Sequence, residues 1–464
     1  MGTTGFARDR HPPRGLALRP TTMFLMLGAM YGSPRGVEAK EPPVQQEIDR
    51  LREEIRDYRG LDRRHAIDQD RLAEIRSLVV DVIADAERRT SFQEADRMSG
   101  WRQGFRIGSR DDSFRLEAAG QLQVRYVLNR VRNGEPEYLN GFENRRTRLN
   151  LRGHVMDPRW TYRIRTTFSA RNGRANVDEA WIARDLGDGW EFKVGQFKPP
   201  FLREQLVPDS RLLGAERSVV SLNFDQARSQ GMQLSWTGES DRFAGWTGDG
   251  LPGPAFGVAR ANGFNTSWTE SNAWYSVVAR GEHRLAGSWE QLDGFNSPRG
   301  SEFAAMAGLS GLIQRARESA IGVNDAMVGA VTADLTLAFS GASIFASGVW
   351  AHETVPGGSS SNPWGVTVQG GVFVLEDVEL FGLYEYLLYD PTRRTGFTEG
   401  GRYNGVTVGG NWFLNPATRL TLDWSMNFSS LSDGSQIAVL AGMRVDSPGD
   451  SGQWALRAQL QLLF

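Results

Sequence analysis

The segment WALRAQLQLLF, from Trp454 to Phe464, decides the fold because its side chains alternate in character. One face of the extended chain would carry apolar residues: Trp454, Leu456, Ala458, Leu460, Leu462 and Phe464. The other face would carry Ala455, Arg457, Gln459 and Gln461. Successive side chains of a β-strand point to opposite sides, so this period of two predicts a strand with one apolar and one largely polar face.

The same pattern recurs along the chain beyond residue 113. In residues 419–428, Leu420, Leu422, Trp424, Met426 and Phe428 alternate with Arg419, Thr421, Asp423, Ser425 and Asn427. Residues 115–126 and 160–168 alternate in the same way. Such segments are long enough to cross a bilayer as tilted strands, which takes about 9 to 11 residues each. One face would then meet hydrocarbon and the other water.

Composition excludes several other classes. The 464 residues have a mean hydropathy of -0.41, and no apolar run after residue 40 approaches the roughly 18 residues of a membrane-spanning helix. The absence of cysteine removes disulfides and thiolate ligands or nucleophiles. A net charge of -2 gives no overall attraction to nucleic acid. If the chain spans a membrane, it does so with strands.

A soluble β-sandwich shows the same alternation, but three details favour a membrane barrel. Tryptophans lie near the ends of predicted strands, where a membrane interface would place them: Trp160, Trp190, Trp274, Trp364, Trp412 and Trp454. An aromatic residue, Phe464, ends an alternating strand, as expected of an outer-membrane insertion signal. Only a closed sheet satisfies its backbone polar groups in hydrocarbon. We therefore predict an all-β transmembrane barrel of about 16 antiparallel strands over residues 113–464, wide enough for an aqueous channel.

The first hundred residues have a different organisation. Four arginines, an apolar stretch at residues 23–31 and small residues near Ala39 predict a signal peptide over residues 1–39, with the mature chain starting at Lys40. Apolar residues at three-four spacing predict an α-helical segment over residues 40–98, followed by a linker at residues 99–112. The helix either forms a short coiled coil with other copies or folds against its own barrel. Either arrangement places it in the periplasm.

Several motifs together resemble the phosphate-selective porin O and P family. They are Gly120-Gln121-Leu122-Gln123 on the first predicted strand, Phe142-Glu143-Asn144-Arg145-Arg146-Thr147-Arg148-Leu149 on the second, Asp178-Glu179-Ala180-Trp181-Ile182 on the fourth, and Val194-Gly195-Gln196-Phe197-Lys198-Pro199-Pro200-Phe201 closing the fifth. Glu216-Arg217-Ser218 follows. The resemblance implies an outer-membrane porin, a homotrimer of sixteen-stranded channels that conducts small hydrophilic solutes, with preference for phosphate-type anions. It also implies an inward-folded third loop, which we expect within residues 202–224.

Basic residues carry the predicted selectivity. The candidates for the constriction loop are Arg203, Arg211 and Arg217, which stand beside Glu204, Asp209 and Glu216 without a lysine. Basic candidates for the pore wall are Arg115, Arg125, Arg146, Arg148, Arg152, Arg163, Arg165, Arg171 and Lys193. A wall of like charges around a water-filled pore concentrates anions. The alternative is that lumen carboxylates neutralise the row, the nearest being Glu117, Glu143, Asp178 and Glu191.

Other chemistry finds little support in the sequence. The glycines of residues 248–253 are spaced as in a dinucleotide site, but Pro252 and the following sequence do not provide the helix that such a site needs. The five histidines lack ligand spacing, so we expect no metal, no cofactor and no enzyme activity. Two alternatives stay open. The protein could tether the outer membrane to the cell wall, with peptidoglycan as a partner of its N-terminal helix, or it could be a soluble periplasmic sugar-binding protein.

Overall fold

The computed structural model describes residues 49–50, 52–54, 99–101, 105–130, 136–170, 172–249, 273–316, 325–354, 356–357, 360–388, 402–428 and 451–464. Contacts divide the chain into two units, Met1–Ser91 and Phe92–Phe464. In the first unit, residues 49–50 and 52–54 are helical. The predicted signal peptide and the rest of the predicted helical segment lie outside the described residues. No helix among the described residues is long and apolar enough to span a membrane.

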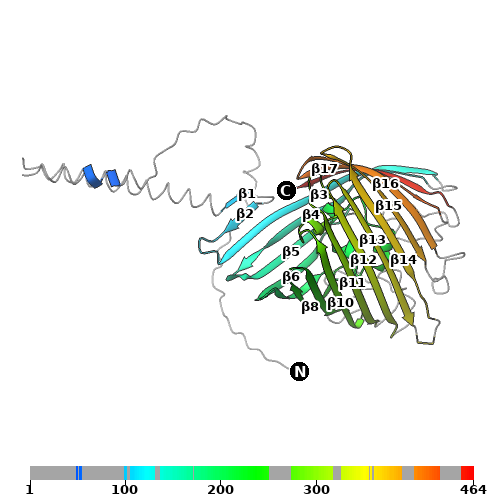
Figure 1. Ribbon diagram of the computed structural model, residues 1–464, viewed down its shortest axis with the longest axis horizontal. Coiled ribbons are helices and arrows are strands. Elements are labelled where there is room, and N and C mark those ends of the chain that lie inside the picture. Colours follow the sequence, from blue (N-terminus) through cyan, green and yellow to red (C-terminus); the bar gives the residue numbers. More distant parts are fainter. Residues whose placement is uncertain are drawn as a thin grey trace, which may run out of the picture. The chain divides into compact units, whose positions relative to one another are not determined.

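Within the described residues of the second unit, sixteen antiparallel strands form a closed ring (Figure 1). They are β3 (Phe114–Arg130), β4 (Tyr138–Val155), β5 (Asp157–Phe168), β6 (Ala175–Gly187), β7 (Trp190–Phe197), β8 (Ser229–Thr237), β9 (Asp241–Gly248), β10 (Ala273–Ala286), β11 (Ala304–Ala316), β12 (Met327–Phe339), β13 (Ala342–Thr354), β14 (Trp364–Phe373), β15 (Val378–Leu388), β16 (Arg402–Asn415), β17 (Thr418–Asn427) and β18 (Trp454–Leu463). Each strand pairs with its neighbours in sequence, and β18 pairs with β3 to close the ring. The predicted barrel of about sixteen strands is confirmed.

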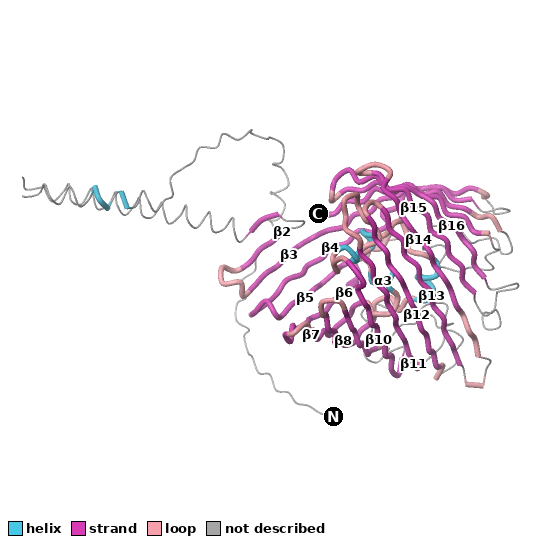
Figure 2. The backbone as a smooth tube through the Cα atoms, viewed as in Figure 1, coloured by secondary structure: helices cyan, strands magenta, loops and turns pink. Residues whose placement is uncertain are grey.

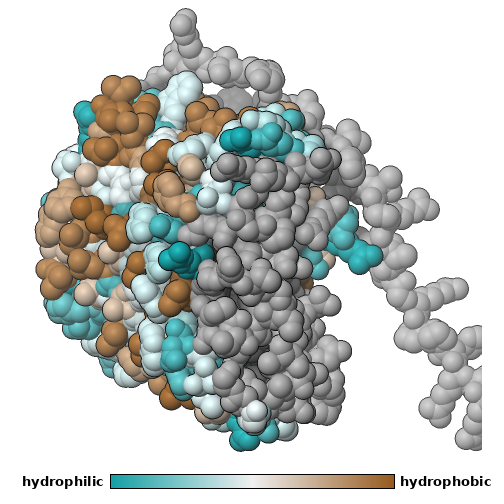
Figure 3. Space-filling model, turned by 90° about the vertical axis from the view of Figure 1, so that its right-hand side faces the viewer, coloured by the Kyte–Doolittle hydropathy of each residue, from teal (hydrophilic) through white to brown (hydrophobic). Residues whose placement is uncertain are grey.

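The wall of the barrel is apolar outside and polar inside. On β17 and β18, Leu422 and Leu460 are 52% and 47% exposed, whereas Asp423 and Gln459 are 1% exposed. Figure 3 shows patches of hydrophobic residues among paler and hydrophilic ones on the described part of one face. A soluble sandwich would bury its apolar face, so this inverted distribution excludes the soluble alternative and suits a barrel surrounded by lipid.

Two short strands precede the ring. β1 (Ser99–Trp101) pairs with β2 (Phe105–Gly108), and β2 pairs with residues 115–118 of β3. On the same edge of β3, β18 pairs with residues 121–130, and the backbone of Phe464 pairs with Gly120. β2 therefore pairs with the part of β3 that extends beyond the end of β18. The expectation of a linker over residues 99–112 did not include these strands, because three or four residues are too few to show alternation.

Two connections among the described residues fold into the barrel. The constriction loop, residues 198–228 between β7 and β8, contains α3 (Arg203–Leu206), η1 (Asp209–Arg211) and α4 (Val219–Phe224). The inner turn, residues 287–303 between β10 and β11, contains η4 (Gln291–Asp293). Figure 2 draws these helices in cyan within the ring of strands. Most residues of the constriction loop are buried, as an inward-folded loop requires.

Candidate functional site

Glu216 of the constriction loop binds three arginines of the barrel wall. One carboxylate oxygen lies 2.7 Å from Nη1 of Arg125, the other lies 2.7 Å from Nη2 of Arg146, and Arg145 donates to both. Only 2% of the Glu216 side chain is exposed. Arg145 is the extra residue of a β-bulge, because Gln123 pairs with Arg146 and the next residue of β3, Val124, pairs with Asn144. The arginines of β3 and β4 thus hold the loop.

Asp209 makes a second junction of the same kind. It pairs with Arg148 of β4 and with Arg217 of the loop itself, and its Oδ1 lies 3.7 Å from Nε of Arg146. The surrounding arginines hold the pKa of the Asp209 carboxyl well below its usual value, against the opposing effect of burial. The carboxylate is therefore charged at neutral pH.

Strands β15 to β18 bind the main chain of the same loop. Arg419 donates to the carbonyl of Leu212 over 2.8 Å, and Asn411 donates to that of Leu213 over 2.9 Å. In the opposite sense, backbone N–H groups of the loop donate to carboxylates: Ala215 to Asp423 over 2.9 Å, and Val219 and Val220 to Glu385. The loop is therefore fixed against β3, β4 and β15 to β18.

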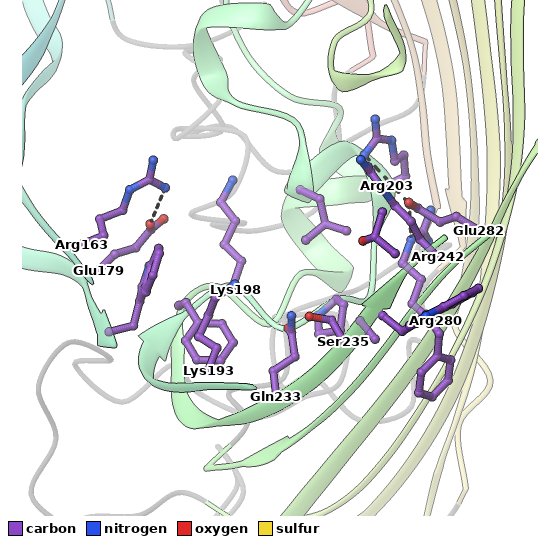
Figure 4. Close-up of a pocket in the computed structure, with 18 of the residues that line it drawn as sticks. Arg163, Glu179, Lys193, Lys198, Arg203, Gln233, Ser235, Arg242, Arg280 and Glu282 are labelled. Carbon is purple, nitrogen blue, oxygen red and sulfur yellow. Dashed lines mark hydrogen bonds and ion pairs between the residues drawn. The ribbon is translucent and has the colours of Figure 1, made fainter. Parts of the chain in front are cut away.

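Among the described residues, an open space lies between the loop and strands β5 to β10. It is a cavity of about 370 Å³, shown in Figure 4. The loop contributes Lys198, Pro200, Arg203, Leu206 and Pro208, and the strands contribute the other side. The cavity therefore lies on the side of the loop that faces β5 to β10.

The cavity is strongly basic. Among the described residues that line it, seven are basic (Arg163, Arg165, Lys193, Lys198, Arg203, Arg242 and Arg280) and two are acidic (Glu179 and Glu282). In Figure 4 each carboxylate lies beside arginines, and the distances are 3.4 Å between Glu179 and Arg163 and 2.8 Å between Glu282 and Arg280. Asp178 and Asp334 neutralise part of the remaining charge from behind the lining. More cations than carboxylates still face the cavity.

Two of these cations form cation–π contacts with aromatic rings. The Nζ atom of Lys193 lies 5.0 Å from the ring centre of Trp181 and 5.4 Å from that of Phe197, and Arg163 lies over the same Trp181 at 5.8 Å. Gly195 allows this arrangement, because it has a φ of 134° and a Cβ there would lie 2.2 Å from the carbonyl oxygen of Ala180. The face of an aromatic ring attracts a cation electrostatically, so the rings help to position these two side chains.

Lys198 begins the constriction loop and lines the cavity. Its ammonium donates to the backbone carbonyl of Gln205. Burial lowers the pKa of Lys198 well below its usual value, and the positive charges of Arg217 and Arg228 lower it further. Lys198 therefore loses its positive charge at a lower pH than an ordinary lysine does.

The structure divides the predicted basic residues by location. Arg163, Arg165, Lys193 and Arg203 line the cavity, whereas Arg125, Arg146, Arg148 and Arg217 bind loop carboxylates. Arg115 pairs with Asp112, Arg152 with Glu117 and Arg211 with Asp293, all outside the cavity lining. Arg171 lies outside the described residues. Each carboxylate named as a neutralising partner forms an ion pair: Glu117, Glu143, Asp178 and Glu191.

Several residues of the site were not among the candidates predicted from the sequence. Lys198 appeared there only as part of a strand-closing motif, yet β7 ends at Phe197 and Lys198 belongs to the loop. Arg242 and Arg280 lie on β9 and β10, far in sequence from the arginine-rich segments. They were not singled out from the sequence, and the position of the loop shows that they face the cavity.

Comparisons with known proteins agree with this geometry. Residues 117–266 match the phosphate-selective porin O and P family. The matched segment contains the motifs of the first five barrel strands, the constriction loop, and the strands β8 and β9 that follow it. The resemblance seen in the sequence is confirmed. No curated protein is a significant match to the sequence.

Solved porin structures share the fold. An anion-selective porin from Comamonas acidovorans is 12% identical with a TM-score of 0.52, covering 76% of this chain and all 100% of its own. The outer membrane channel DcaP of Acinetobacter baumannii is 14% identical with a TM-score of 0.52, over 77% of this chain and 99% of its own. OmpT of Vibrio cholerae is 11% identical with a TM-score of 0.50, and the match covers 77% of this chain and 99% of OmpT. At these identities the likeness concerns the fold.

Proposed function

We propose that this protein is an outer-membrane porin whose water-filled channel favours small anions where it passes the constriction loop. The observation that carries the proposal is the excess of basic over acidic side chains around the cavity. Like charges in a lumen with low-dielectric walls raise the local concentration of counter-ions. The family match and the likeness in fold to the anion-selective porin of Comamonas acidovorans point in the same direction.

In this proposal, the ion selectivity is determined by the side of the lumen that β5 to β10 form. The arginines of β3 and β4 are held in ion pairs with Glu216 and Asp209 and do not line the cavity. Arg163 and Lys193 border the cavity, with 30% and 19% of their side chains exposed. Arg163 pairs with Glu179 over 3.4 Å and Lys193 with Glu191 over 3.2 Å, so both cations are partly neutralised, but they remain within reach of a passing anion.

The test is a reversal-potential measurement in planar bilayers across a KCl gradient. The wild-type channel should pass chloride in preference to potassium, and the double variant Arg163→Gln with Lys193→Gln should show a lower anion-to-cation permeability ratio. Arg159→Gln is the matched control, because Arg159 pairs with Asp157 at the turn end of β5 and is 59% exposed. The difference should shrink in 1 M salt, where the Debye length is about 3 Å. A wild-type channel that prefers cations would overturn the proposal.

Phosphate is the solute in the family's name, and its passage is a separate question. Addition of phosphate should reduce the chloride current if the cavity holds it better than chloride. The lysine available for this is Lys198, beside Arg203 and Arg280. An equal effect of sulfate would show a general preference for oxyanions.

Assembly and topology follow from the family rather than from the geometry. We infer a homotrimer in the outer membrane, with the N-terminal segment in the periplasm. The mass of the complex in mild detergent tests the first part. Protease access to the N-terminal segment from the periplasmic side tests the second.

A further inference from the structure

The inner turn is much longer than its neighbours at the same end of the barrel. Only Ser340 and Gly341 separate β12 from β13, and only Asp188 and Gly189 separate β6 from β7, whereas residues 287–303 separate β10 from β11. The inner turn also buries apolar side chains, with Leu292 1% and Phe295 2% exposed. A connection of this length with buried side chains usually has a function of its own.

The inner turn packs against the constriction loop. The N–H of Phe295 donates to the carbonyl of Arg211 over 3.2 Å, and Arg203 donates to the carbonyl of Leu292. The Phe295 ring belongs to a buried apolar cluster that includes Val207 and Leu212 of the loop. The two inward segments therefore form one packed unit.

The barrel wall holds the inner turn at several points. Ser343 of β13 donates to the carbonyl of Phe295 over 2.5 Å, and Arg299 donates to the carbonyl of Phe373 at the end of β14 over 2.9 Å. At the other end, Trp289 donates to the carbonyl of Glu239 between β8 and β9 over 3.1 Å. The turn consequently runs along the inside of the lumen from β8 to β14.

Asp293 of the inner turn lies between two arginines. Its carboxylate is 3.9 Å from Arg211 of the constriction loop and 3.9 Å from Arg242 of β9, and the exposed fractions of the three side chains are 48%, 51% and 31%. Arg242 lines the basic cavity and also stacks on Trp289, with its guanidinium carbon 4.0 Å from the ring centre. Exposed ion pairs at such distances contribute little to stability. The main effect of these charges is therefore on the electrostatic potential in the lumen.

We propose that the inner turn is a second selectivity element of the pore, and that Asp293 is its specificity-determining residue. This inference rests on the proposed channel function. Asp293 partly cancels the charges of Arg211 and Arg242 at the edge of the cavity, and so limits the anion preference that the cavity would otherwise impose. A less basic edge also allows a bound anion to leave, since conduction requires that binding in the filter be weak enough for release.

The test compares the wild-type channel with four variants by reversal potential at low salt. Asp293→Asn should raise the anion-to-cation permeability ratio by about twofold, because two arginines lose their neutralising partner. Arg242→Gln should lower it, and the double variant should lie near wild type. Glu290→Gln removes the same charge from an exposed position in the same turn, and it should change the ratio by much less.

Each outcome has a distinct meaning. An unchanged ratio in Asp293→Asn, with wild-type channels anion-selective, overturns the role of Asp293 and leaves the proposed function standing. Equal increases in Asp293→Asn and Glu290→Gln would also overturn it, because the effect would then come from net charge alone. Wild-type channels without conductance would instead overturn the proposed function. If Asp293→Asn does not insert, Asp293→Ser is measured in its place, and an unchanged ratio there counts against the inference.

Discussion

Glu216 shows how one side chain organises the lumen. Its carboxylate is almost fully buried, yet it is surrounded by Arg125, Arg145 and Arg146. Burial of a charge is unfavourable unless partners satisfy it, and here each arginine in turn depends on the carboxylate. The loop and the wall are therefore held together by charges that neither could bury alone.

Replacement Glu216→Gln should release the constriction loop. The substitution removes the carboxylate that Arg125, Arg145 and Arg146 share. Breaking a buried ion pair of this kind costs about 3 to 5 kcal/mol. The barrel should still form, because its hydrogen bonds lie between strands. Limited proteolysis should then cut within residues 198–228, and the open-channel current should become noisier. Glu143→Gln is the control, since Glu143 is 34% exposed and forms an ion pair with Arg125 of the same cluster; equal resistance to cleavage in both variants would refute the role of Glu216.

Lys198 should make the selectivity of the channel depend on pH. Its pKa lies well below the usual lysine value of about 10.4, so it loses its proton, and its positive charge, earlier as the pH rises. Anion preference should therefore decline with rising pH at values below those at which ordinary lysines titrate. Lys198→Arg keeps the charge throughout this range and should remove the decline. A wild-type reversal potential that stays constant as the pH is raised, before ordinary lysines titrate, would contradict this.

The elements could be predicted to different degrees. Alternation located β3, β5, β17 and β18, because each strand faces lipid on one side and water on the other along its whole length. Bulges were not predictable. At Asp178, as at Arg145, one extra residue sits between paired positions and turns an additional charge inward. The position of a bulge depends on how a strand pairs with its neighbour, and the sequence of one strand does not reveal that register.

The inward segments illustrate a second limit. The resemblance placed the constriction loop within residues 202–224, and the structure shows an inward loop over residues 198–228. The inner turn was missed altogether. Its buried residues, such as Leu292 and Phe295, contact parts of the chain that are distant in sequence, and its polar ends are typical of any surface turn. Neither period nor composition distinguishes a turn that folds inward from one that extends into solvent.

At the scale of the whole molecule, the barrel is a unit separate from the N-terminal region. Contacts divide the chain after Ser91, and β1 and β2 belong to the barrel unit. Deletion of residues 41–91 should therefore leave insertion, single-channel conductance and selectivity unchanged. Envelope defects in cells carrying this deletion, with normal conductance, would reveal a tethering role. A deletion protein that inserts but does not conduct would show that the N-terminal region is needed for the pore.

The way in which the wall binds the constriction loop has a consequence for how such channels diversify. Arg419, Asn411, Asp423 and Glu385 recognise main-chain carbonyl and amide groups of the loop between Leu212 and Val220. Every amino acid except proline offers the same two groups. Mutations that change loop side chains can accordingly accumulate without loosening these attachments. A new solute range can then arise by drift or by design within an unchanged scaffold, and this barrel is a suitable starting point for engineered nanopores.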